Sequence, residues 1–465
     1  MRSAPATLRR LARLWPLLAL VLFALGAGGG CAYFNTYSNA RRYFKQAENM
    51  QRTPDGKITP NARKAYDDSI EKCKKLMELY PDSKYVDDAL FLMSRAYFEK
   101  SEYGSCLRRL DELEERFPDH EWREQALYMR GVCDLENGDE SRAIADLDRL
   151  QEEFPKSKHL AEGMFRRAEA EYRLGNWDDA IGAYQRLLES FKQSEFNDEA
   201  RLKIALTQRE LGQDSLAVET VAVLAEKGRN RRTVFEGQLA AAEILFDQHR
   251  YAECGALLGE LEPVAENFQS RGPVLLLQAR LVEADGDLEK AATQFENVAT
   301  EFPRSNSAAE AWYRIGLIRQ NREHDLEQAI VAYDNARKEV PRSLFADLAG
   351  TKSKAVQEVI DFRAQSGEEA PDSSAAQLQF RLAENQLLRL EDPEAALAEY
   401  GKVLEDYPDS PLASQAAYAL AYINRYSLAD TLAARRAVAL LLERYPESDS
   451  ARYVEGWLDA LGPAQ

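Results

Sequence analysis

The chain has 465 residues, a formal net charge of −18 and a sequence pI near 5.0. A chain this acidic repels phosphate backbones, which excludes nucleic acid as an expected partner. Apolar residues at 45% and aromatic residues at 9% exclude a disordered chain, and the length allows more than one domain.

The N-terminus predicts a secretory signal peptide over residues 1–30. Four arginines precede an apolar run from Leu14 to Ala27. This run of about 14 residues is shorter than the roughly 20 that a membrane-spanning helix needs. A short, uncleaved membrane anchor is the alternative interpretation.

Cys31 follows the apolar run directly, after the small residues Gly29 and Gly30. This arrangement resembles a bacterial lipoprotein, although Gly28 stands where Leu or Val is usual. The resemblance implies that Cys31 carries a lipid and, since Ala32 follows it, that the protein faces the periplasm from the outer membrane. More than one acyl chain would make the anchor stable. The alternative is ordinary signal cleavage near residues 24–28, which would leave Cys31 as a free thiol.

A repeat of 37 residues fills most of the chain. The phrase Y/F-P-x-S recurs, with Pro81, Pro118 and Pro155 each 37 residues apart and Pro303 in the same phase. The 37-residue phase runs through positions 81, 118, 155, 192, 229, 266 and 303, some of which carry no proline. The residue twelve positions before each of them is small: Ser69, Cys106, Ala143, Ala180, Ala217, Cys254 and Ala291. Four residues further on, most side chains are bulky and apolar: Cys73, Leu110, Leu147, Tyr184, Val221, Leu258 and Phe295. This spacing marks one face of a helix that packs closely on another.

Each repeat predicts two helices. In residues 158–192, two runs with apolar residues at helical spacing flank a turn at Gly175 and Asn176. No segment alternates with period 2, so no strand is predicted. The pattern resembles the tetratricopeptide repeat, whose marks in residues 309–341 are Trp312, Ile315, Gly316, Ala329, Tyr333, Ala336 and Pro341. The resemblance implies an all-α fold, a right-handed superhelical solenoid of tetratricopeptide-like helix pairs.

Three regions follow the signal peptide in this interpretation. Residues 31–341 form an N-terminal solenoid of about eight helix pairs. Residues 342–374 break the phase and hold an extra helix, expected over 344–362, and a polar linker. Residues 375–465 form further pairs and a capping helix, expected over 450–462.

The repeat length, the Y/F-P-x-S phrase and Cys31 together resemble outer-membrane lipoproteins of the BamD (YfiO) type. The resemblance implies a lipid-anchored periplasmic scaffold that takes part in outer-membrane β-barrel assembly and binds barrel clients or the assembly machinery. The units also resemble those of CpoB (YbgF), so an envelope coordinator working with peptidoglycan synthesis or the Tol-Pal system is the alternative. The first helix pattern begins near Thr36, so the first repeat lies within about 18 Å of Cys31.

The sequence predicts neither an enzyme nor a metal or cofactor site. Cys73, Cys106, Cys133 and Cys254 fall on apolar positions of the repeat, which predicts that they are packed in the core. The histidines fall in turns or at helix starts, show no ligand spacing and are expected on the surface: His120, His159, His249 and His324. An enzyme whose site leaves no motif remains the alternative.

A protein-binding groove is the remaining candidate site. In tetratricopeptide folds the first helix of each pair lines the concave face, and two positions of that helix carry large side chains in successive repeats. The candidate groove residues are Phe91, Arg95, Phe98, Tyr128, Phe165 and Tyr172. The alternative is that these side chains pack between adjacent first helices.

Overall fold

The computed structural model describes residues 35–53, 56–321, 325–365, 372–454 and 456–460. All regular elements within these ranges are helices. The predicted signal peptide and Cys31 lie outside the described residues. The chain divides into two compact units, Met1–Ile244 and Leu245–Gln465, and the division falls within one helix.

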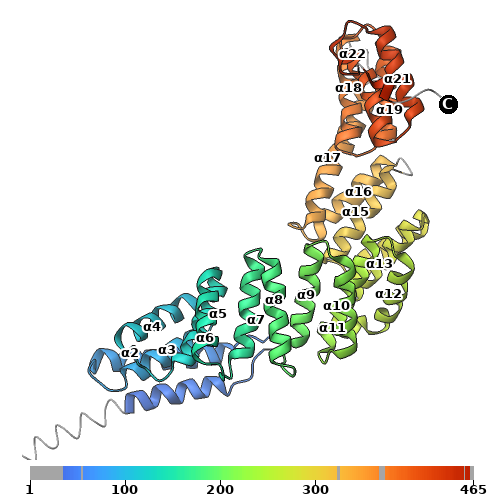
Figure 1. Cartoon of the computed structure of the whole chain (residues 1–465). Coiled ribbons are helices and arrows are strands. Elements are labelled where there is room, and N and C mark those ends of the chain that lie inside the picture. Colours follow the sequence, from blue (N-terminus) through green and yellow to red (C-terminus); the bar gives the residue numbers. More distant parts are fainter. Residues whose placement is uncertain (1–34, 54–55, 322–324, 366–371, 455, 461–465) are drawn as a thin grey trace, which may run out of the picture. The chain divides into compact units, whose positions relative to one another are not determined.

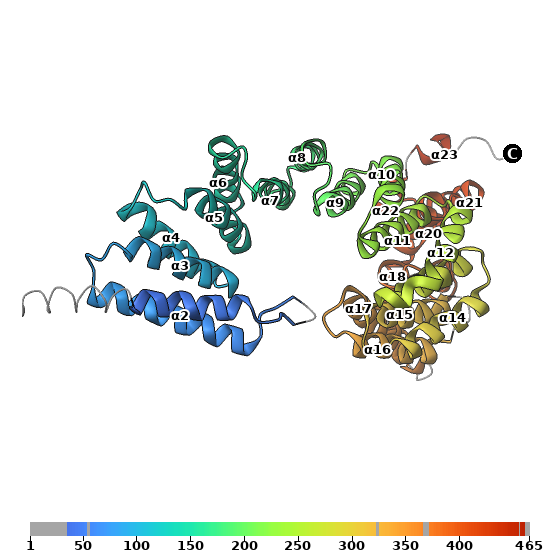
Figure 2. The same cartoon turned by 90° about the horizontal axis from the view of Figure 1, so that it is seen from below.

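The first unit is a succession of helices, each lying beside the next (Figure 1). It begins with a helix described over residues 35–48. The helices that follow are α2 (Pro60–Leu79), α3 (Val86–Glu99), α4 (Tyr103–Arg116), α5 (Arg123–Asn137), α6 (Glu140–Glu153), α7 (Leu160–Arg173), α8 (Trp177–Ser190), α9 (Asn197–Glu210), α10 (Asp214–Lys227) and most of α11 (Arg231–Asp247). The view turned by 90° shows the same succession from α3 to α9 (Figure 2).

The second unit continues with helices of similar length. They are α12 (Tyr251–Ala265), the 3-10 turn η1 (Glu266–Phe268), α13 (Arg271–Ala284), α14 (Leu288–Glu301), α15 (Asn306–Asn321), α16 (Leu326–Glu339), α17 (Leu344–Gln365), α18 (Asp372–Leu388), α19 (Pro393–Asp406), α20 (Ala413–Tyr422), the π-helical turn η2 (Ile423–Ser427), α21 (Thr431–Arg444), α22 (Asp449–Tyr453) and α23 (Trp457–Ala460).

The helices pack as consecutive pairs, which confirms the predicted fold of tetratricopeptide-like helix pairs. In the first unit the pairs are α3–α4, α5–α6, α7–α8 and α9–α10, and each pair also contacts its neighbour. In the second unit α13–α14, α15–α16, α18–α19 and α20–α21 repeat the arrangement. Each pair buries its apolar faces against the next, as the solenoid principle requires.

The predicted small-to-large register forms the core. Each of the seven small residues is fully buried, from Ser69 and Cys106 to Ala291. The large residues four positions on are also buried, and Cys73, Tyr184 and Phe295 have no exposed surface. Close approach of two helices at the small position lets the large side chain reach the facing helix. The predicted burial of the small position and that of the large position are both confirmed.

The turn inside each pair has a conformation that the sequence indicates only in part. A residue with positive φ recurs every 37 residues, at Ser101, Gly138, Gly175, Gly212, His249 and Gly286. Glycine adopts this left-handed conformation without steric cost. Ser101 and His249 adopt it with a side chain, at φ 58° and 59°.

Two predicted details differ from the structure near the C-terminus. The expected single capping helix over 450–462 is wrong, because it is two short helices, α22 and α23, interrupted at Gly456 with φ 80°. The extra helix is present as α17, which packs on α15 and α16 and runs to Gln365. The boundaries at 342 and 374 stay predictions.

Candidate functional site

A groove of about 820 Å³ opens on the first repeat. Three segments supply its walls: the helix over 35–48, helix α3 with Tyr85 before it, and the turn that leads into α5. The lining residues that carry rings are Tyr37, Phe44, Tyr85, Phe91 and Trp122. Such aromatic walls suit the apolar side chains of a bound peptide.

Ring stacking holds the walls of the groove in place. The Tyr37 and Tyr85 rings stack with their centroids 5.1 Å apart, and Phe91 stacks on Trp122 at 4.9 Å. The Arg95 guanidinium lies 4.5 Å from the centre of the Phe44 ring. These contacts fix side chains that would otherwise lose rotamer freedom on binding a ligand, so the groove is preorganised.

Charged groups of both signs line the same groove. Arg95 forms an ion pair with Glu48 at 2.7 Å. Burial, followed by the nearby Asp87 and Glu121 carboxylates, raises the pKa of the Asp88 carboxyl to about 6. Burial, followed by the Asp88 charge, raises the pKa of the Tyr37 hydroxyl well above its ordinary value. A cationic group of a ligand would therefore be stabilised at the Asp88 side of the groove.

The structure brings only some of the six predicted groove residues together. Phe91 and Arg95 line the groove of the first repeat. Phe98 and Tyr128 contact each other one repeat further on, with ring centroids 6.2 Å apart. Phe165 is 1% exposed and therefore offers no surface to a ligand.

Tyr172, the last of the six, is half-buried and its ring lies 5.9 Å from the Lys203 ammonium. It is not among the residues that line the groove of the first repeat. The groove assignment of Phe98, Tyr128, Phe165 and Tyr172 stays a prediction.

A second row of rings completes the arrangement, and the sequence prediction missed it. The residue just before each first helix is aromatic in four successive repeats, at Tyr85, Trp122, His159 and Phe196, each 37 residues from the next. In three of these repeats it stacks on the first-helix ring of the preceding repeat: Phe91 on Trp122, Tyr128 on His159, and Phe165 on Phe196. The constant spacing was the signal that could have found the row.

The serine of the Y/F-P-x-S phrase, or of the equivalent F-K-Q-S at residues 191–194, helps to place this row. The Oγ atoms of Ser83, Ser157 and Ser194 accept hydrogen bonds from the backbone N–H of Tyr85, His159 and Phe196. This local bond shapes the turn between helix pairs. The repeat phrase therefore encodes the orientation of the stacked rings as well as the end of a helix.

The expectation of surface histidines is wrong for His120. Its side chain is buried, its Nε2 lies 3.3 Å from Glu114, and its Nδ1 accepts a hydrogen bond from the Trp122 backbone. His159 is half-buried against Tyr128, and burial lowers its pKa. His249 is exposed as expected, whereas His324 lies outside the described residues.

The four register cysteines are buried and form no disulfide, which confirms their predicted packing role. Burial raises the pKa of the Cys73 thiol to about 12 and that of Cys254 to about 11. A contact with Cys106, followed by burial, raises the pKa of Cys133. Thiols of this kind are poor nucleophiles at neutral pH.

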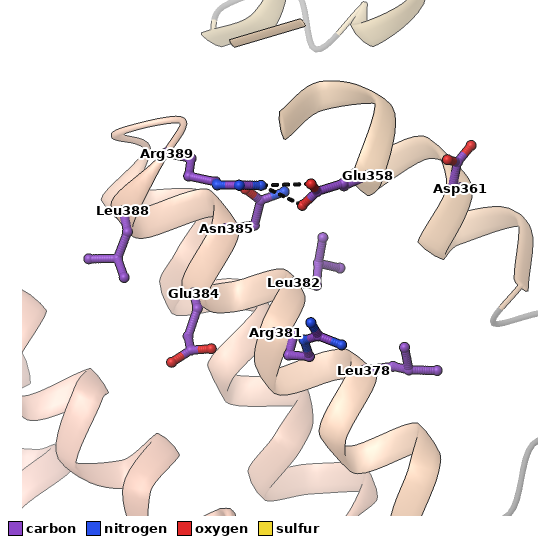
Figure 3. A pocket seen from close by; sticks show the side chains of 9 residues that line it. All are labelled: Glu358, Asp361, Leu378, Arg381, Leu382, Glu384, Asn385, Leu388 and Arg389. Carbon is purple, nitrogen blue, oxygen red and sulfur yellow. Dashed lines mark hydrogen bonds and ion pairs between the residues drawn. The ribbon is translucent and has the colours of Figure 1, made fainter. Parts of the chain in front are cut away.

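A second hollow, of about 600 Å³, lies between α17 and α18 (Figure 3). Arg389 reaches across it and binds both carboxylate oxygens of Glu358 at 2.7 Å. Asn385 donates a hydrogen bond to the Ala355 carbonyl at 2.9 Å, while its Oδ1 is buried without a partner. The hollow combines acidic, basic and leucine side chains, so its chemistry selects no single ligand class.

Two features are missing from the described part of the chain. Within it, no group of three His, Cys, Asp or Glu side chains is placed to hold a metal ion. None of the helices that the structure describes combines the length and apolar character needed to cross a bilayer.

The helix pairs and their stacked turns define a tetratricopeptide-repeat protein. Comparison of the sequence with known families adds the particular type. Residues 59–219, less than half of the chain, match YfiO, described as an outer membrane lipoprotein. Residues 377–410 match a tetratricopeptide repeat. One part of the chain is thus similar to the YfiO outer membrane lipoprotein family and another part to the tetratricopeptide repeat, and the resemblance seen in the sequence is confirmed.

Solved structures of several tetratricopeptide proteins are similar to parts of the chain. One from Parabacteroides merdae is 16% identical, covers 59% of this chain and 97% of its own, with a TM-score of 0.39. The C-terminal part of one from Cytophaga hutchinsonii is 16% identical, covers 56% and 98%, with a TM-score of 0.43. PilF of Pseudomonas aeruginosa is 15% identical, covers 48% and 95%, with a TM-score of 0.36. No curated protein matches the sequence.

Proposed function

We propose that the chain is a lipid-anchored periplasmic scaffold that binds other proteins and acts as a BamD-like component of outer-membrane β-barrel assembly. The observation that supports it most is the YfiO match over residues 59–219, because this range contains α3 and Trp122 of the groove. Proteins of the two matched families act as scaffolds, so no catalytic role is proposed.

The groove of the first repeat is the proposed peptide-binding site. Its aromatic walls can take apolar side chains, and its charged rim can orient the backbone of an extended or helical segment. The basic lining residues are Arg41, Arg42, Lys45 and Arg95, and the acidic ones are Glu48, Asp88 and Glu121. Because the chain as a whole carries −18, this groove is less acidic than the remaining surface.

The anchor proposed at Cys31 would hold this groove close to the membrane. Helix is described from residue 35 onward, and Tyr37 of that helix lines the groove. The four residues from Cys31 to residue 35 span at most about 14 Å. A client that leaves the bilayer surface, or a partner embedded in it, would meet this groove first.

The anchor is tested by fractionation of cells that express the wild type or Cys31→Ala. The wild type should float with outer membranes, and the variant should move to the soluble periplasmic fraction. A variant that still floats with outer membranes would contradict lipidation at Cys31.

The partner is tested by site-specific photocrosslinking from the groove. A photoreactive amino acid replaces Trp122, and the matched control carries it at Leu216, a residue of α10 that is 45% exposed. Barrel-assembly components or barrel clients should be captured from position 122 and not from position 216. Capture of peptidoglycan-synthesis or Tol-Pal proteins instead would support the envelope-coordinator alternative and reject the assembly role.

A further inference from the structure

An exposed group of aromatic side chains lies at the C-terminal end of the second unit, outside the region matched to YfiO. It consists of Tyr418 and Tyr422 on α20, Tyr426 in η2, Tyr453 on α22 and Trp457 on α23, together with Arg425. This set is called the C-terminal aromatic cluster below. Its residues come from four elements, so the cluster exists only in the folded unit.

The rings contact one another in a continuous network. Tyr422 lies 6.2 Å from Tyr418 and 4.9 Å from Tyr426, measured between ring centroids. Trp457 joins the two ends of this row, at 5.9 Å from Tyr418 and 5.8 Å from Tyr426. Tyr453 adds a fifth ring at 6.1 Å from Tyr418.

The π-helical turn η2 keeps this row on one face. It continues α20 directly, and the wider turn places Tyr426 beside Tyr422. The Asn424 side chain secures it with a hydrogen bond to the Leu420 carbonyl at 2.8 Å. Single π turns inside helices occur frequently at functional sites, because they disturb regular hydrogen bonding to place particular side chains.

The rings of the cluster are more exposed than aromatic side chains of a packed core. Here Tyr422, Tyr426 and Tyr453 are 44%, 57% and 71% exposed. Such an aromatic patch on a folded protein marks an interaction surface.

Arg425 gives the patch its charge. Its guanidinium lies 4.6 Å from the centre of the Trp457 ring and 5.0 Å from that of Tyr426. Arg425 forms no ion pair or hydrogen bond with any residue that the structure describes. A guanidinium stacked on rings still presents its N–H edge, which pairs with a carboxylate in bidentate geometry.

We propose that the C-terminal aromatic cluster binds a segment of a partner protein that presents a carboxylate beside an aromatic or proline side chain. Tyrosine, tryptophan and arginine are the side chains that dominate protein interfaces, because they bury much area at low entropic cost. The carboxylate pairs with Arg425, and the ring or proline packs between the tyrosines. A membrane surface would instead require several cations, and the cluster has one.

This site does not depend on the proposed role in barrel assembly or on the anchor at Cys31. It predicts binding by the C-terminal unit even where the groove of the first repeat has another partner. Its test is therefore separate from the crosslinking experiment at position 122.

The test is selection of peptides on the purified full-length protein in detergent. A random library of 12-residue peptides is selected on the wild type, with counter-selection on Arg425→Gln. Peptides that are enriched should share a carboxylate next to an aromatic residue or proline. A fluorescein-labelled member should then bind about tenfold or more weakly to Arg425→Gln, the loss expected for one charge-assisted hydrogen bond.

Matched variants separate recognition from folding. Arg452→Gln is the control, because Arg452 is exposed on α22 and pairs only with Asp449 among the described residues, so this variant should bind the peptide as the wild type does. Tyr453→Ala removes a ring that is 71% exposed and should weaken binding without lowering the melting temperature. Replacing the peptide carboxylate by an amide should weaken binding to the wild type and leave binding to Arg425→Gln unchanged.

Several results would overturn the proposal. Enrichment of no peptide, or of peptides without a carboxylate, would do so, as would equal binding to wild type and Arg425→Gln. Vesicles of anionic phospholipid, peptidoglycan fragments and the protein itself at high concentration are assayed in parallel. If one of these ligands binds in a way that requires Arg425 and the acidic peptides do not bind, that ligand is the occupant of the cluster. A partner protein is then rejected.

Discussion

Gly316 tests how closely the helices of one pair must approach. It lies in α15, and a Cβ atom at this position would stand within 2.9 Å of three carbons of the Tyr333 ring on α16. Tyr333 is fully buried and its hydroxyl donates a hydrogen bond to Gln320 Oε1 at 2.8 Å. The ring cannot move aside without disturbing this bond, so Gly316→Ala must separate the two helices.

The expected loss follows from three contributions. Overpacking of a buried site costs about 1–3 kcal/mol. Weakening the Tyr333–Gln320 hydrogen bond adds about 1 kcal/mol, and the better helix propensity of alanine returns about 1 kcal/mol. The net destabilisation of the α15–α16 pair is therefore about 1–3 kcal/mol.

Hydrogen exchange measured by mass spectrometry is the suitable assay, because a chain of two units need not unfold in one step. Amides of α15 and α16 in Gly316→Ala should exchange roughly 5 to 150 times faster than in the wild type, which corresponds to that loss. Unchanged or slower exchange in both helices would refute the close-packing argument.

Two controls accompany the Gly316 experiment. Gly259→Ala places a methyl group at an exposed site of α12 with no atom within 4 Å, so it should stabilise α12 by about 0.5–1 kcal/mol. In a background that contains Tyr333→Ala, Gly316→Ala should lose most of its effect, because the clashing ring is gone. The coupling between the two substitutions measures the contact directly.

Three further predictions concern single sites. Burial, followed by the nearby Asp146 charge, raises the pKa of Asp134 from 3.8 to about 6, so the folded chain loses stability as the pH rises through this window. Asp134→Asn should therefore raise the unfolding free energy at pH 7.5 by at most about 3 kcal/mol, which a higher melting temperature would show. At pH 4 the variant and the wild type should melt at the same temperature. Maleimide should label Cys73 and Cys254 only as the protein opens, and labelling of native protein as fast as a free thiol would contradict their burial. Ser101→Gly should raise the melting temperature, because Ser101 has φ 58° and glycine relieves about 1–2 kcal/mol of left-handed strain, which exceeds its own entropic cost of about 0.5–1 kcal/mol.

The fold could be predicted because one physical constraint repeats along the chain. The small residue at Ala180 and the large one at Tyr184 recur at a fixed interval, and both are buried in every repeat that shares the register. Helix period and repeat period together determine which face is apolar, so no distant contact was needed to identify it.

The groove could be predicted only in part, because one of its walls lies outside this register. The helix over 35–48 is followed by a long turn before α2, which shifts Tyr37 and Phe44 away from the 37-residue spacing. Trp122 keeps the spacing, but a residue that precedes a helix is usually a polar cap, so its ring suggested no role. His120 is buried for a related reason, since the turn between pairs packs against the preceding helix.

The two candidate surfaces occupy equivalent positions of the repeat. Phe91 follows Tyr80 of its Y-P-x-S phrase by 11 residues, and Tyr418 follows Tyr407 by the same number. In the N-terminal repeats the next unit supplies a stacked ring, as Trp122 does for Phe91, and covers this position. After Tyr418 no complete pair follows among the described residues, and the short helices α22 and α23 leave its neighbouring rings exposed. Exposure of the rings around this repeat position therefore depends on the element that follows: the next unit covers Phe91 with Trp122, whereas the short helices α22 and α23 leave Tyr422, Tyr426 and Tyr453 exposed.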